Sequence, residues 1–183
     1  MLLKKIFLFI FIGFFSMTSL AAHKEKDQAE ILNVVDSFAV FADNSAFEYL
    51  GQLFTDKVTI DYTSAFGGEP TTTSNVNLMQ QWAGLLPGFD LTRHAISNIK
   101  VNISGQQATV TSDITASHYL GDKGFWQISG SYRFDLVNVD GHWQISQLTL
   151  LAKSETGNRD VLAEAGKLAA QRLNQKLERK INY

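Results

Sequence analysis

Two of the four histidines lie in stretches whose pattern places them on the same side of a predicted β-sheet. They are His94 and His118. Imidazole changes charge near neutral pH, so it is the side chain best suited to moving a proton at that pH. A lone histidine on an apolar strand face is usually a core or rim residue, whereas two that converge favour a functional site. His23 and His142 lie near a terminus and after a turn, and we expect both to be exposed and without a chemical role.

The alternation of residues 92–104 contains an irregularity that decides where His94 points. Apolar residues up to Ile103 occupy odd positions, whereas Ile96 and His94 occupy even ones. Side chains of an unbroken strand alternate between faces, so His94 and Ile103 would lie on opposite sides. One extra residue near Asn98, a β-bulge, would return His94 to the core face.

The next strand supports this interpretation. A tight glycine turn pairs Ile103 with Ala108, and with the bulge counted His94 falls opposite Ala116 and diagonal to His118. Diagonal neighbours lie about 7–8 Å apart, close enough to share a ligand. Two histidines on adjacent strands are also compatible with zinc, but no third ligand clusters with them, so we expect no metal.

An acidic residue and a group of aromatic residues complete the candidate site. Asp43 either caps a helix or stands at the mouth of the space that the sheet encloses. Tyr62 is either a core residue or a hydrogen-bond donor to a substrate oxygen. We expect four further aromatic residues to line the core or the pocket: Trp82, Phe89, Trp126 and Tyr132.

The elements that must position these residues follow from apolar periodicity. A helix from residue 25 ends at Asp43-Asn44-Ser45, and a short second helix should place Phe54 on its inner face. Asp140-Gly141 is a strong hairpin turn. The remaining predicted elements are a strand at 58–62, a loop at 66–70, a helix from Ser74 to Leu85, strands at 92–104, 108–120, 125–139 and 142–152, and a helix at 158–180. Helices followed by a run of antiparallel strands indicate an α+β fold.

Residues 1–22 have the layout of a secretory signal peptide. Lys4 and Lys5 precede an apolar run from Ile6 to Phe15, and Ser19-Leu20-Ala21 fits a small-residue cleavage site. The alternative is an uncleaved membrane anchor, but the run is shorter than the roughly 20 residues that span a bilayer. We therefore expect an exported, periplasmic or secreted protein that has no membrane attachment after cleavage.

Composition limits the remaining possibilities. The chain of 183 residues has no cysteine, so a packed core and not disulfides must stabilise it. Its length suits one domain. With 16 basic and 18 acidic residues it lacks the basic excess of a nucleic-acid-binding protein, so we expect no nucleic-acid partner.

Four segments together resemble the SnoaL-like branch of the nuclear transport factor 2-like superfamily. They are VTIDYTSAFGGEP, WAGLLPGFDLTRHAISN, VNISGQQATVTSDITASHYL and GSYRFDLVNVDGHWQISQLTL, in the family's order and spacing. The resemblance implies a cone-shaped α+β barrel, with helices packed on a curved, mostly antiparallel sheet. It assigns residues 23–153 to this domain and leaves 154–183 as a C-terminal helical extension, which either covers the pocket or mediates assembly.

Within that family the pattern is most similar to scytalone dehydratase and the bile-acid 7α-dehydratases. The resemblance implies catalytic roles for Asp43, Tyr62, His94 and His118. It departs from scytalone dehydratase at three positions, where this chain has Ala42, Gly130 and Tyr132. Substrate contacts should therefore differ, and scytalone itself is not the expected substrate.

The leading hypothesis is a dehydratase or isomerase that uses an Asp-His pair for proton abstraction and needs no cofactor. It would act on a small apolar or cyclic ligand, and the chain would form a homodimer or homotrimer. The alternatives are a non-catalytic periplasmic binding or accessory module, and an interaction protein that uses the open side of the sheet. Asp43 and His94 within hydrogen-bond reach inside a closed pocket would favour catalysis, and their separation by packed aromatic residues would favour the alternatives.

Overall fold

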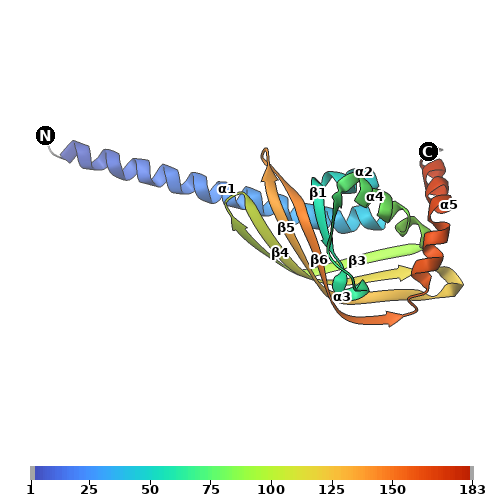
Figure 1. The fold of residues 1–183 in the computed structure, drawn as a ribbon. Coiled ribbons are helices and arrows are strands. Elements are labelled where there is room, and N and C mark those ends of the chain that lie inside the picture. Colours follow the sequence, from blue (N-terminus) through green and yellow to red (C-terminus); the bar gives the residue numbers. More distant parts are fainter. Residues whose placement is uncertain (1–2, 182–183) are drawn as a thin grey trace.

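The fold is a curved six-stranded sheet whose inner face is covered by helices (Figure 1). The computed structural model describes the backbone of residues 3–181 and the side chains of residues 22–176. The elements are α1 (Leu3–Asp43), α2 (Phe47–Gln52), β1 (Phe54–Asp61), α3 (Thr63–Phe66), β2 (Thr71–Ser74), α4 (Asn75–Ala83), the 3₁₀ turn η1 (Leu86–Gly88), β3 (Leu91–Ser104), β4 (Gln107–Tyr119), the 3₁₀ turn η2 (Gly121–Lys123), β5 (Phe125–Val139), β6 (His142–Gly157) and α5 (Val161–Ile181).

The strands lie in the order β2-β1-β6-β5-β4-β3, and only the β1–β6 pair is parallel. This arrangement confirms the predicted α+β class. The predicted leader falls mostly outside the described side chains, although the backbone from Leu3 onward belongs to α1. Among the described residues, no helix is both long enough and apolar enough to span a membrane.

Helix α1 supplies the inner layer through an apolar stripe along one of its faces. Ile31, Val35, Phe38 and Ala42 are all buried, at 2% exposure or less, and they recur at the spacing of one helix face. Full burial of one such large apolar side chain contributes about 1.5–3 kcal/mol. The end of α1 is thereby fixed against the sheet, and that end carries Asp43.

The β-bulge in β3 is present where the alternation predicted it. The β3–β4 pairing shifts between Ser97 and Lys100, and Asn98 adopts a φ of 53°. Asparagine tolerates this left-handed conformation better than most residues. On either side of the bulge Ile103 pairs with Ala108 and His94 pairs with Ala116. The bulge therefore places His94 on the inner face of the sheet, as predicted.

Three differences from the prediction have a clear physical reason. Phe54 begins β1 instead of ending the second helix, because the Leu53 carbonyl accepts a hydrogen bond of 2.8 Å from the Ile145 amide of β6. Strand β2 has no counterpart among the predicted elements, since it is short and polar and forms by pairing with β1. Strand β6 continues to Gly157, five positions beyond the predicted end at Ala152, because β5 offers it a pairing edge as far as Trp126.

The C-terminal helix α5 packs against the turn η1. Val161, Ala165 and Ala169 are buried at 1% exposure or less. Contact is close because Gly88 has no side chain: a Cβ there would lie 1.9 Å from the Ala165 carbonyl oxygen. Arg172 of α5 also donates to the Gly88 carbonyl at 2.7 Å. This docking brings the start of α5 to the edge of the pocket.

Candidate active site

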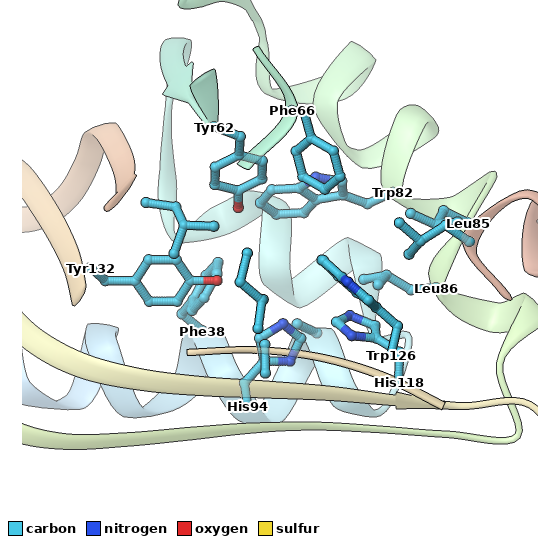
Figure 2. A pocket seen from close by; sticks show the side chains of 15 residues that line it. Phe38, Tyr62, Phe66, Trp82, Leu85, Leu86, His94, His118, Trp126 and Tyr132 are labelled. Carbon is cyan, nitrogen blue, oxygen red and sulfur yellow. The ribbon is translucent and has the colours of Figure 1, made fainter. Parts of the chain in front are cut away.

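A pocket of about 180 Å³ lies between the inner face of the sheet and the helices (Figure 2). Its lining is mainly aromatic and aliphatic, with two histidines, two tyrosine hydroxyls and two tryptophan indoles as its polar groups. The lining residues are Phe38, Ala42, Tyr62, Phe66, Trp82, Leu85, Leu86, His94, Ala116, His118, Trp126, Ile128, Tyr132, Leu150 and Leu162. An apolar wall with a few converging polar groups is typical of a small-molecule site.

Asp43 and His94 form a hydrogen-bonded pair at the floor of this pocket. His94 Nδ1 lies 2.6 Å from Asp43 Oδ1, and the His94 backbone amide donates to Asp43 Oδ2 at 2.9 Å. Both carboxylate oxygens thus hold the same residue, which fixes the imidazole ring. Burial by itself raises the pKa of the Asp43 carboxyl. The hydrogen bonds and charge of His94, with a smaller contribution from Thr92, nevertheless hold that pKa below its ordinary value.

This pair settles which ring nitrogen of His94 is available. Because Asp43 stays ionised it can only accept, so His94 Nδ1 carries the proton between them. Nε2 is then the ring nitrogen with a free lone pair, and His94 lines the pocket whereas Asp43 lies behind it. The geometry is that of a general base with its orienting carboxylate.

His118 lies beside His94 in a drier environment. The two ring centroids are 5.8 Å apart, and the His118 ring is enclosed by Phe89 at 5.0 Å and Trp126 at 5.2 Å. Burial, aided by the nearby His94, lowers the pKa of His118 to about 4. His118 is therefore neutral at pH 7, and its buried Nδ1 has no hydrogen-bond partner among the described residues.

Tyr62 and Tyr132 face the interior from the opposite side, with both hydroxyl groups directed into the pocket (Figure 2). Burial raises the pKa of each phenol well above its ordinary value. The hydrogen bond between the two hydroxyls raises the pKa of Tyr62 further and partly offsets the rise at Tyr132. Both therefore remain protonated at neutral pH. They can donate hydrogen bonds to an oxygen that lies between them and His94.

The structure brings most of the expected site residues together. Tyr62, His94 and His118 line the pocket, as do three of the four aromatic residues named from the sequence, Trp82, Trp126 and Tyr132.

Phe89 is different: it follows the turn η1, packs behind His118 and is 1% exposed, so it does not reach the pocket surface. Its ring packs against that of His118 and takes no part in the lining of this pocket.

Three of the lining residues that were not named from the sequence come from the helices: Phe38, Phe66 and Leu162. Phe38 carried a usable signal, because it lies on the apolar stripe of α1 that faces the sheet. Phe66 and Leu162 carried none, since one lies in a segment expected to be a loop and the other in the extension beyond the family resemblance. Among residues 22–176, no group of three or more histidine, aspartate or glutamate side chains could hold a metal ion.

Comparison with known proteins places this geometry in a family. The SnoaL-like domain matches residues 25–149. The sequence matches none of the curated proteins compared with it. Among solved structures, the Kfla4162 protein of Kribbella flavida is 28% identical with a TM-score of 0.68, over 80% of this chain and 99% of that chain.

Two further structures share the fold at lower identity. A predicted scytalone dehydratase from Novosphingobium aromaticivorans is 22% identical with a TM-score of 0.67, over 76% of this chain and 92% of that chain. A type 2 hexachlorocyclohexane dehydrochlorinase, LinA, is 16% identical with a TM-score of 0.62, over 74% of this chain and 91% of that chain. The chain therefore belongs to the SnoaL-like domain family and has the nuclear transport factor 2-like fold.

Proposed function

We propose that this protein is a cofactor-independent lyase that eliminates water or a similar small leaving group from a small cyclic, carbonyl-bearing substrate. The observation that carries the proposal is the Asp43–His94 pair, joined at 2.6 Å at the floor of an apolar pocket. A rigidly held imidazole with one free nitrogen serves to remove a proton from carbon, and the paired carboxylate stabilises the imidazolium that results. Two fold neighbours are named as a dehydratase and a dehydrochlorinase, both names for enzymes of elimination, which supports the same class of reaction.

The remaining polar groups of the pocket suit the oxygen of such a substrate. Removing a proton next to a carbonyl moves negative charge onto the carbonyl oxygen. The Tyr62 and Tyr132 hydroxyls are held protonated and can donate to that oxygen. His118, held neutral, can hydrogen-bond the leaving hydroxyl. Preorganised donors in a pocket with little water stabilise such charge far better than bulk water does.

The proposed elimination balances without any external reactant. The C–H bond next to the carbonyl breaks, and its proton passes to His94 Nε2 while the electron pair forms the new carbon–carbon double bond. The neighbouring C–O bond breaks, and the departing hydroxyl takes the proton back from His94 to leave as water. His94 returns to its starting state, and no group is oxidised or reduced.

Pocket size restricts the substrate to about one substituted ring. A cavity of about 150 Å³ accommodates benzene in another protein, so about 180 Å³ here suits a ring with one or two oxygen substituents. The expected small apolar or cyclic ligand is consistent with this size. Among the residues whose side chains are described, no lysine, arginine or carboxylate lines the pocket, which disfavours charged substrates.

Proton abstraction can be tested without knowing the natural substrate. The purified chain is incubated with 3-hydroxycyclohexanone in D₂O, and NMR follows deuterium incorporation beside the carbonyl and appearance of the conjugated enone. We expect His94→Asn to reduce exchange about 10²–10⁴-fold, with Asp43→Asn also reducing it because the base loses its orienting charge. The matched control is His142→Asn, whose side chain is 82% exposed.

The midpoint of urea unfolding verifies that each variant is folded. Equal exchange in wild type and His94→Asn would refute the lyase assignment. Ligand binding without exchange in the wild type would instead support the binding module, and mass spectrometry of molecules that remain bound to the purified protein would then identify what it holds.

Export and assembly are part of the same proposal. After export and cleavage of residues 1–22, the protein would act in the periplasm or outside the cell. The leader, with two lysines followed by an apolar run, supports this. Cell fractionation with N-terminal sequencing tests it. The homodimer or homotrimer stays a prediction, which light scattering of the purified protein tests.

A further inference from the structure

The outer wall of the pocket consists of two aromatic rings with very different exposure. Phe66 of α3 and Trp126 of β5 both line the pocket, and their ring centroids lie 6.0 Å apart. Trp126 is only 3% exposed, whereas Phe66 is 52% exposed. Phe66 therefore stands between the pocket and solvent, at the upper edge of the view in Figure 2.

Arg159 holds this wall from outside. Its guanidinium carbon lies 5.3 Å from the centre of the Phe66 ring and 5.8 Å from that of Trp126. The same group donates to the Ala65 carbonyl at 2.9 Å. Glu155 fixes the guanidinium through a bond of 2.9 Å to Nε and a second bond to Nη2. Arg159 therefore ties the end of α3 to the segment between β6 and α5.

The two ends of α3 are held by different partners. At its start, Thr63 donates to Asp61 at 2.7 Å, and the Ser64 hydroxyl donates to the Leu150 carbonyl at 2.5 Å. At its other end Phe66 is followed by Gly67 and Gly68, with φ of 72° and 80° and open space around each Cα. The aromatic ring of Phe66 contacts the Arg159 guanidinium and the Trp126 ring.

Space to move exists beside the Phe66 ring. A second groove of about 310 Å³ borders the pocket and shares three aromatic residues with it, Tyr62, Phe66 and Trp82. A rotation of the Phe66 side chain toward this groove or toward solvent would open the pocket without moving the sheet. Arg159 itself does not line the pocket, so it can affect passage without touching the ligand.

We propose that Phe66 and Arg159 form a gate, in which the Phe66 ring closes the pocket and the Arg159 guanidinium holds that ring in the closed position. The gate sets the rate at which ligands pass. It leaves the affinity for a small ligand nearly unchanged, because the closed state is held in the same way with or without a ligand inside. This property is independent of the chemistry inside the pocket.

The test uses nitrobenzene, a neutral one-ring quencher of tryptophan emission. Trp82 and Trp126 line the pocket, whereas Trp143 is buried elsewhere and gives a constant background. Stopped-flow fluorescence gives the association and dissociation rates. We expect Arg159→Gln to raise both rates about five- to tenfold, with the dissociation constant changed by less than about twofold.

The matched control is Arg172→Gln, which removes another guanidinium of the same C-terminal region that bonds Gly88 and Asp90, away from the Phe66 ring. It should leave both rates unchanged. In a Phe66→Ala background, Arg159→Gln should have no further effect, because the ring that it holds is gone. Urea midpoints verify that each variant is folded.

Three results would overturn the gate. One is unchanged rates in Arg159→Gln. Another is an equal acceleration in Arg172→Gln, which would attribute the effect to looser docking of α5. The third is the same acceleration by Arg159→Gln in the wild-type and Phe66→Ala backgrounds, which would show that Arg159 does not act through Phe66.

Discussion

His118 should make the folded protein lose stability as the pH falls below neutrality. Its pKa is about 4 in the folded protein because the ring is enclosed by Phe89 and Trp126, and it is about 6.5 in an unfolded chain. Between these values the unfolded chain binds a proton that the folded protein does not. Stability therefore rises with pH across this window and falls as the pH falls through it.

The size of the effect follows from the two pKa values. For one group that shifts from about 6.5 to about 4, the free energy of unfolding should fall by about 2 kcal/mol between pH 7 and pH 5. The lowered pKa of Asp43 has its effect at a lower pH. Stability from that carboxylate is present above its unfolded pKa of about 3.9 and is lost as the pH falls through its lower folded value.

The measurement compares wild type with His118→Gln by urea unfolding at several pH values from 7 to 5. The variant cannot bind a proton at this position, so its pH dependence should be smaller by about 2 kcal/mol over that range. His142→Gln is the control, because that side chain is 82% exposed and should leave the slope unchanged. Parallel pH profiles for wild type and His118→Gln would refute the argument that burial keeps His118 neutral.

Two further predictions concern the backbone that positions the site. Gly88→Ala should destabilise the protein by about 1–3 kcal/mol in urea unfolding. The reason is that its Cβ would lie 1.9 Å from the Ala165 carbonyl oxygen and force α5 away. An unfolding midpoint equal to that of the wild type would contradict this close approach. Asn98→Ala should lower the free energy of unfolding by about 1–2 kcal/mol, because Asn98 has a left-handed φ of 53°. Asn98→Gly should lower it less. Equal losses in the two variants would show that the left-handed backbone is not the cause.

The local sequence pattern was sufficient to predict features that depend only on neighbouring residues. The change of phase between His94 and Ile103 required an extra residue, and the structure has the register shift beside Asn98. The Asp140-Gly141 turn follows the same logic, with φ of 52° and 89° at its two residues. Such features could be predicted because strand alternation and turn geometry depend on a few consecutive residues.

Boundaries set by distant partners could not be predicted in this way. Phe54 has the spacing of a helix residue, yet the bond between Leu53 and Ile145 draws it into β1. Thr71–Ser74 is too short and polar to signal a strand, and it becomes β2 because β1 offers an edge. The apolar character of Phe89 indicated burial, but not whether the ring would face a ligand or the back of His118.

The sequence by itself determined the α+β class, the inward orientation of His94 and His118, and the residue types able to carry out proton transfer. These depend on periodicity, which the order of residues contains. Only the tertiary structure decided that Asp43 would meet His94 at 2.6 Å across 51 positions, and that Phe66 and Leu162 would close the same pocket. Those outcomes depend on how α1, α3 and α5 pack on a curved sheet, and this packing brings together residues that are far apart in the chain.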